Sequence, residues 1–192
     1  YNSFLFLEKD NVQIFDKQIL VPFGEFLPFR SYIKFLENIS GNVDFTPGNK
    51  ERIIKSSDQI NILPVICYEI IFNKVLRKIN ENEIDIIINI TNDSWFGNTL
   101  GPYQHFYHAR MRALISNKYL LRVSNNGISA IIDNNGNVLT FTKLNTIKSF
   151  NYLLEIKNTM YFGTIHNILI FYLIFIIFIN FIFYKYNYKY DK

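Results

Sequence analysis

Cys67 is the single cysteine of this 192-residue chain and the first candidate for nucleophilic chemistry. The apolar run Asn61–Ile66 predicts a buried strand that ends directly before it, and a helical pattern begins near Glu69. A thiol between a strand end and a helix start faces unpaired backbone N–H groups, which favour the thiolate. The position suits a nucleophile. A lone cysteine beside a strand is also commonly a small buried hydrophobe, and Cys67 alone does not decide between the two.

Lys17 and Glu25 are a second candidate group. Lys17 ends a predicted strand, and a Pro-Phe-Gly bend separates it from Glu25. Such a bend can bring the two side chains into one site, where the ammonium stabilises an oxyanion and the carboxylate orients the ammonium. The alternative is an ordinary ion pair on the surface.

His105 and His108 are three residues apart on one face of a predicted helix, a spacing that suits two metal ligands. No third ligand stands at a metal-binding spacing, so we interpret both as solvated or hydrogen-bonded side chains. The segment from Gly97 to Gly101 lacks the Lys-Ser/Thr ending of a phosphate-binding loop. We therefore expect neither a metal nor a cofactor.

The elements that must position these residues alternate between strands and helices. Two helices are predicted, one around Ile70–Ile79 and one at Gln104–Asn117, and Ser40–Ser57 is predicted to be a loop. Strands are predicted at Tyr1–Leu7, Val12–Asp16, Asn61–Ile66, Ile84–Ile90, Tyr119–Ser124, Ser129–Ile132 and Val138–Phe141. Strands interleaved with helices indicate an α/β fold with helices packed on a sheet.

Composition narrows the classes of protein further. The chain is 49% hydrophobic, 17% aromatic and 19% charged, which is far too apolar for a disordered protein. The formal net charge is +4 and the basic residues are scattered, so we expect no nucleic-acid partner. The length suits one folded domain. The chain begins at Tyr1 without a signal-like segment, and we interpret it as the carboxyl-terminal part of a longer protein.

The stretch Ile165–Tyr184 contains no charged residue. About twenty helical residues cross the roughly 30 Å hydrocarbon core of a bilayer, so we predict a transmembrane helix here rather than a buried core helix. Lysines follow in the tail 185–192, and the positive-inside rule places that tail in the cytoplasm. A domain over residues 1–160 is then expected on the outer face of the membrane.

Six motifs, taken in order, are similar to one known family. They are Phe15–Glu25, Ile66–Ile70, Thr91–Gly97, Gly101–His105, His108–Leu114 and Arg122–Gly127. They resemble the apolipoprotein N-acyltransferases, a membrane branch of the nitrilase (carbon–nitrogen hydrolase) superfamily. The resemblance runs from about Tyr1 to Phe141. It implies an α/β nitrilase-type αββα sandwich, partial because its amino-terminal part is missing, followed by one transmembrane helix.

The resemblance also implies catalytic roles. Cys67 matches the nucleophile of a Glu–Lys–Cys triad, and Lys17 matches the triad lysine. The Lys17 ammonium and the backbone N–H of Tyr68 would together stabilise the tetrahedral oxyanion. Glu25 matches an auxiliary carboxylate that helps to hold the site.

Substrate-binding roles are implied for Tyr68, Glu69 and Trp95, of which Trp95 matches an aromatic residue on the lipid-facing side. In this family the thiolate takes an acyl chain from a phospholipid as a thioester and passes it to the α-amino group of the diacylglyceryl-cysteine of an apolipoprotein. The implied setting is the bacterial inner membrane, with the catalytic domain on the periplasmic face. A monomer is expected.

Two departures from the family pattern leave alternatives open. The triad glutamate lies upstream of Lys17 in the family, and Glu8, the only glutamate there, falls in a turn and cannot be assigned that role. Ile115 stands where the superfamily usually has a glutamate, and we expect a buried polar partner to be lost. The chain alone is therefore expected to be inactive. A nitrilase-type amidase and an inactive remnant of a split or decaying gene remain as alternatives.

Overall fold

The computed structural model describes residues 1–32, 43–50, 52–77, 83–155 and 170–181. The chain divides into two compact units, Tyr1–Ile156 and Lys157–Lys192. The first unit contains the sheets and the candidate site residues.

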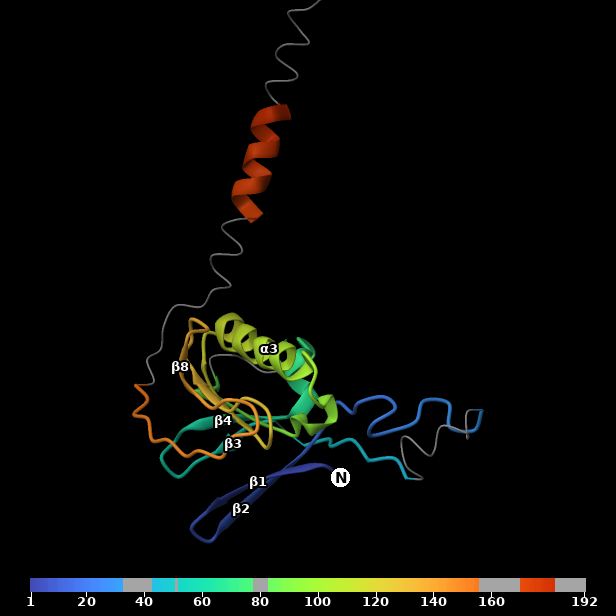
Figure 1. The fold of residues 1–192 in the computed structure, drawn as a ribbon. Helices are drawn as coiled ribbons and strands as arrows, with labels where there is room; N and C mark the ends of the chain where they lie inside the picture. The colour runs from blue at the N-terminus through green and yellow to red at the C-terminus, as the bar shows by residue number, and fades with distance from the viewer. Residues whose placement is uncertain (33–42, 51, 78–82, 156–169, 182–192) are drawn as a thin grey trace, which may run out of the picture. The chain divides into compact units, whose positions relative to one another are not determined.

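Among the described residues, the strands of the first unit form two sheets (Figure 1). The smaller sheet is an antiparallel hairpin of β1 (Ser3–Glu8) and β2 (Asn11–Asp16). The larger sheet has the order β3-β4-β5-β6-β7-β8, in which β4, β5 and β6 are parallel and the other pairs are antiparallel. Its strands are β3 (Ile54–Lys55), β4 (Asn61–Ile66), β5 (Ile86–Thr91), β6 (Tyr119–Ser124), β7 (Ala130–Ile132) and β8 (Val138–Phe141).

Helical segments follow the parallel strands. The 3-10 turn η2 (Cys67–Ile71) and the short helix α2 (Lys74–Arg77) come after β4, and the 3-10 turn η4 (Asp93–Phe96) comes after β5. The long helix α3 (Gly101–Ser116) begins with a proline in its first turn and ends at Asn117, which adopts the left-handed conformation common at helix ends. Turns and helix starts therefore gather where the parallel strands end.

The larger sheet is buried on both faces because alternate side chains of its parallel strands enter two different cores. Leu63, Val65, Ile87 and Leu120 pack with Ala109 and Ala113 of α3. Ile62, Ile66 and Ile86 pack with Phe4 and Phe15 of the hairpin. The first unit is thus layered as helix, sheet and second sheet, and Figure 1 shows α3 and the hairpin on opposite sides of the larger sheet.

The predicted elements agree with these in kind, but several of the boundaries differ; α3, for example, begins at Gly101 and not at Gln104. The fifth strand begins at Ile86 instead of Ile84. The helix predicted around Ile70–Ile79 is divided into η2 and α2, and its last residues lie outside the described ranges. The predicted loop Ser40–Ser57 contains the short strand β3, which extends the larger sheet at its edge.

The described part of the second unit is a helix over residues 170–181 whose apolar side chains are exposed. Within the described residues, no helix is both long and apolar enough to span a membrane. The ends of the predicted span, residues 165–169 and 182–184, lie outside those residues. The transmembrane helix therefore stays a prediction.

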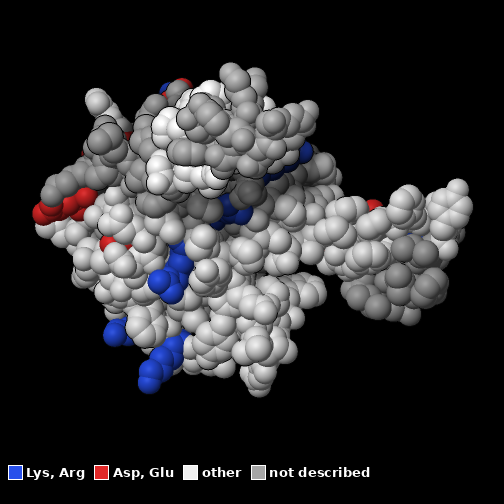
Figure 2. Space-filling view, turned by 90° about the horizontal axis from the view of Figure 1, so that it is seen from above, with Lys and Arg blue, Asp and Glu red and all other residues white. Residues whose placement is uncertain are grey.

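Charged side chains do not gather in one patch on the face seen in Figure 2. On the face shown in Figure 2, lysine and arginine side chains stand in several separate places with uncharged surface between them. This distribution fits the modest net charge of +4.

Candidate active site

A cavity of about 920 Å³ opens beside the ends of β2, β4 and β5. Five of the residues singled out in the sequence line it, namely Lys17, Glu25, Cys67, Tyr68 and Trp95. They come from three separate stretches of the chain. The fold therefore brings the predicted catalytic residues to one place.

Lys17 and Glu25 form a buried ion pair. Lys17 Nζ lies 2.6 Å from Glu25 Oε2, and the lysine is only 1% exposed. The backbone N–H of Val21 and the Asn2 amide also donate to the Glu25 carboxylate, each at 2.9 Å. Burial alone would raise the pKa of Glu25, but the hydrogen bonds from Lys17 and Val21 outweigh burial and lower it. The surface-pair alternative is wrong, because the pair is fixed inside the site.

Cys67 occupies a sharp turn between β4 and η2. Its φ angle is 52°, a left-handed conformation that an ordinary side chain adopts at a cost of order 1–3 kcal/mol. The thiol is half-buried, and its sulfur lies 4.0 Å from the Asn92 carbonyl oxygen. The thiol therefore lies at the boundary between the hairpin-side core and the cavity, in a backbone conformation of the kind found at functional sites.

Glu69 lies behind the site and does not line the cavity. It is fully buried, and its carboxylate forms an ion pair with Arg52 at 2.8 Å. Backbone N–H groups of Gln18, Ile19 and Ile66 also donate to it, at 2.8, 2.9 and 3.0 Å. The predicted substrate contact does not fit this geometry, because donors from the protein already surround both oxygens. Glu69 instead ties the segment after Lys17 to the turn that carries Cys67.

Tyr68 and Trp95 border the cavity in different ways. The Tyr68 ring packs against Phe96 and His105, with ring centroids 6.5 and 5.6 Å apart. Trp95, in η4, is 74% exposed. An exposed tryptophan at the rim of a largely apolar cavity is available to contact a ligand or a lipid.

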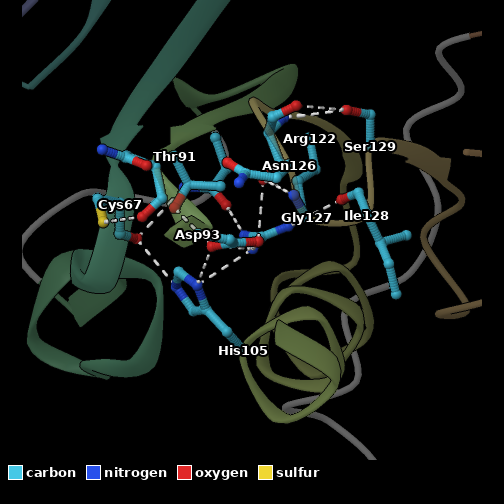
Figure 3. A network of polar contacts seen from close by, with 12 residues as sticks. Cys67, Thr91, Asp93, His105, Arg122, Asn126, Gly127, Ile128 and Ser129 are labelled. Carbon is cyan, nitrogen blue, oxygen red and sulfur yellow. Dashed lines mark hydrogen bonds and ion pairs between the residues drawn. The ribbon is translucent and has the colours of Figure 1, made fainter. Parts of the chain in front are cut away.

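A buried polar cluster lies on the α3 side of Cys67, and the sequence analysis missed most of it (Figure 3). Arg122 donates to Asp93 at 2.9 Å, Asp93 lies 2.9 Å from Nδ1 of His105, and Arg122 also donates to the side-chain oxygen of Asn89. These four residues are at most 2% exposed. Burial alone would raise the pKa of Asp93, but the hydrogen bond with His105 and the charge of Arg122 lower it to about 2.

The alternation of side chains along β5 and β6 could have revealed part of this cluster in the sequence. Asn89 is two residues after the buried Ile87, and Arg122 two after the buried Leu120, so both point to the helix-covered face. His108, by contrast, is exposed. Among the described residues, no group of three potential ligands could hold a metal ion.

The structure shows where the two residues discussed as departures from the family pattern lie, Glu8 and Ile115. Glu8 accepts hydrogen bonds from Ser56 and Ser57 at the turn end of the hairpin and does not line the cavity. Ile115 is 41% exposed on α3, so the expectation of a lost buried partner is wrong. Its position lies on the solvent side of the helix.

The helix–sheet–sheet layering, with a cysteine, a lysine and a glutamate around one cavity, defines a carbon–nitrogen hydrolase. The sequence model of that family, described as carbon-nitrogen hydrolase, matches residues 1–148, and the chain belongs to this family. The structure is also similar to a CN-hydrolase superfamily protein from Xanthomonas campestris, with a TM-score of 0.55 and 19% identity over 76% of this chain and 54% of that one.

Curated relatives narrow the resemblance to one branch of the family. The chain is 41% identical to an apolipoprotein N-acyltransferase of Rickettsia prowazekii, over 77% of this chain and 30% of that protein. It is 48% identical to an apolipoprotein N-acyltransferase of Wigglesworthia glossinidia brevipalpis, over 62% of this chain and 24% of that protein. The chain thus spans less than a third of the length of these relatives.

Proposed function

We propose that this chain is the nucleophile-bearing part of an apolipoprotein N-acyltransferase, which moves an acyl chain from a phospholipid to the α-amino group of the diacylglyceryl-cysteine of an apolipoprotein. The observation that carries the proposal is the cavity shared by Cys67, the Lys17–Glu25 pair and the exposed Trp95. The names of the curated relatives support the choice of reaction.

In the first half-reaction, the Cys67 thiolate attacks the ester carbonyl of the phospholipid. A C–S bond forms and the carbonyl electron pair moves onto oxygen, where the Lys17 ammonium and the Tyr68 N–H stabilise the negative charge. Collapse of this intermediate breaks the ester C–O bond, and the lysophospholipid leaves as an alkoxide that takes up the proton lost when the Cys67 thiol became a thiolate. Glu25 keeps Lys17 in place, because it accepts from the ammonium at 2.6 Å.

In the second half-reaction, the α-amine of the lipidated cysteine attacks the thioester carbonyl. A C–N bond forms, the amine loses a proton, and the Cys67 thiolate leaves with the C–S electron pair. Glu25 is not free to accept this proton, because it is already paired with Lys17, and it is the one carboxylate among the described residues that line the cavity.

We further propose that residues 1–160 form the catalytic domain, residues 165–184 a transmembrane helix and residues 185–192 a cytoplasmic tail. The uncharged stretch and the lysines that follow it support this topology. The cavity then faces the periplasmic leaflet of the bacterial inner membrane, where a monomer can take a phospholipid chain directly. A reporter fused after Lys192 should be active in the cytoplasm, and activity only in the exported compartment contradicts the orientation.

The acylation step is tested with the complete protein in phospholipid–detergent micelles. Its mass should increase by one acyl chain that hydroxylamine removes, and Cys67→Ala should gain no such mass. Lys17→Ala should slow the gain about a hundredfold, as loss of an oxyanion donor commonly does. The matched control is Lys55→Ala, since Lys55 is an exposed lysine at the sheet edge. Acylation of Cys67→Ala would refute the proposal.

Adding a small amide or the lipidated amine to the same protein separates the two alternatives. An amidase passes the acyl group to water and releases ammonia from small amides, whereas an acyltransferase requires the lipidated amine as acceptor. An inactive remnant forms no thioester with either donor. Amide hydrolysis without transfer to the amine would favour the amidase.

A further inference from the structure

The peptide group that joins Cys67 to Tyr68 is contacted from behind the active site. Its carbonyl oxygen lies 3.3 Å from Nε2 of His105 and 3.5 Å from Nδ2 of Asn89. Asn89 also donates to the Val65 carbonyl at 3.0 Å, so its side chain is itself fixed. Two polar groups from α3 and β5 therefore converge on this one carbonyl.

The orientation of that carbonyl determines where the next N–H points. No peptide bond in the described residues is cis, and in a planar trans peptide the C=O and the N–H point in opposite directions. Holding the Cys67 carbonyl toward α3 consequently directs the Tyr68 N–H away from α3. Under the proposed function, on which this inference rests, that N–H is a donor to the oxyanion.

His105 is held in turn by charged groups of other elements. Its Nδ1 lies 2.9 Å from Asp93 in η4 and 3.1 Å from an Arg122 nitrogen in β6. Thr91 and Ser124 each donate to Asp93 at 3.0 Å, which fixes the carboxylate. Figure 3 shows the ring between Asp93 and the Cys67 carbonyl. The ring is therefore braced on the side opposite the nucleophile.

The contact with Cys67 requires a hydrogen on Nε2, because a carbonyl oxygen accepts and does not donate. In the neutral ring with this hydrogen, Nδ1 accepts from Arg122 and makes no hydrogen bond with Asp93, whose carboxylate is then held by Arg122, Thr91 and Ser124. In the doubly protonated ring, Nδ1 donates to Asp93 instead. In either state Nε2 donates to the Cys67 carbonyl.

We propose that His105 is a positioning residue for acyl transfer: it holds the Cys67–Tyr68 peptide so that the Tyr68 N–H meets the oxyanion. It acts through the main chain of the nucleophile and does not touch the acyl group. Asp93 and Arg122 serve to keep its ring in place.

Two substitutions separate this role from a purely structural one. The amide nitrogen of glutamine occupies nearly the place of Nε2, so His105→Gln keeps a donor to the Cys67 carbonyl. The shorter amide of asparagine occupies the place of Nδ1, so His105→Asn keeps a polar group beside Asp93 and loses the donor. Rescue by glutamine but not by asparagine is the signature of the positioning role.

The assay uses the complete protein in detergent with p-nitrophenyl acetate. The thiolate attacks the ester carbonyl, the C–S bond forms, the C–O bond breaks, and p-nitrophenolate leaves with the electron pair and is counted as a burst. We expect His105→Asn to slow the burst about a hundredfold, the usual effect of losing an oxyanion donor, and His105→Gln to stay within about fivefold of the unmodified protein. Alkylation of Cys67 by iodoacetamide forms no oxyanion, and we expect it to change less than about threefold in both variants.

His108→Asn is the matched control, because His108 is a histidine on the same helix whose side chain is exposed and lies outside the cluster. A slow burst in His105→Asn alone, with melting temperatures of all three variants recorded, supports the proposal. Equal losses in His105→Asn and His105→Gln, whether in folding or in rate, overturn the proposal. A loss in His108→Asn as large as that in His105→Asn also overturns it. A normal burst with the ester but no acylation by phospholipid in the unmodified protein would refute the proposed function and leave the role of His105 standing.

Discussion

The substitution Glu69→Gln tests whether Glu69 supports the site or binds the substrate. It changes one oxygen to an NH₂ group and keeps the shape of the side chain, so no cavity forms. Glu69 is fully buried and pairs with Arg52, which is 6% exposed. Every orientation of the glutamine amide turns its NH₂ group toward a donor of the protein, either toward Gln18 and Ile19 or toward Ile66.

The magnitude follows from what is lost. The Arg52 guanidinium keeps its burial and loses its counter-charge, and breaking a buried pair from one side costs about 3–5 kcal/mol. At least one backbone N–H also loses its acceptor. We take the cost of that lost hydrogen bond as part of the about 3–5 kcal/mol and do not add it again. We expect the free energy of unfolding to fall by about 3–5 kcal/mol. We also expect slower acylation, since Gln18 and Ile19 follow Lys17 directly and lose their anchor.

Urea unfolding of the complete protein, followed by circular dichroism, measures the stability, and the p-nitrophenyl acetate burst measures the acylation rate. Glu8→Gln is the matched control, because Glu8 accepts from Ser56 and Ser57 on the outside of the hairpin. Its unfolding midpoint should move far less. If Glu69→Gln leaves the midpoint unchanged and raises only the KM for phospholipid, the carboxylate contacts the substrate and the reasoning is wrong.

Three further predictions follow from the buried cluster and the cavity rim. Gly127→Ala should lower the free energy of unfolding by about 1–3 kcal/mol, as overpacking does, because the added Cβ would lie 1.8 Å from Asp93 Oδ2. In the control Gly24→Ala the added Cβ lies 3.6 Å from its nearest atom, so the loss in urea unfolding should be smaller. The Asp93 pKa is lowered from 3.8 to about 2, so its stabilising contribution is complete above pH 3.8 and lost as the pH falls toward 2; acid titration by circular dichroism should show a weaker pH dependence in Asp93→Asn. Trp95→Ala should leave the melting temperature unchanged, since the side chain is 74% exposed, and should slow acylation by phospholipid more than acylation by p-nitrophenyl acetate.

Local patterns predicted most of the strands because burial on one or both faces leaves a clear mark in the sequence. The hairpin, β4, β6 and β8 appear where the apolar alternation and the Asn-Gly turn place them. β3 was missed, since two residues are too few to show a period and its pairing with β4 is decided by tertiary contact. The start of α3 was placed three residues late, because Gly101 and Pro102 read as a loop until a helix is known to begin there.

Residue types and the family resemblance predicted the candidate residues around the cavity. They did not predict which buried residues hold those residues in place. A cysteine, a lysine and a glutamate attract notice as chemistry. Glu69 was assigned to substrate because nothing local in the sequence reveals that its partners, Gln18 and Arg52, come from distant segments. The sequence predicts His105 as a solvated or hydrogen-bonded side chain but does not reveal its partners, which lie on three other elements.

Cys67 is held from both sides of the larger sheet, and this arrangement accounts for its strained turn. On the hairpin side, Glu69 accepts from the backbone of Ile66, directly before the cysteine, and from the segment after Lys17. On the α3 side, His105 and Asn89 meet the carbonyl directly after it. A φ of 52° persists only where surrounding contacts over-determine it, and here polar contacts fix the peptide groups on both sides of one residue. The segment after Lys17, the turn that carries the thiol and the Tyr68 N–H are therefore coupled through three buried polar side chains, none of which lines the cavity.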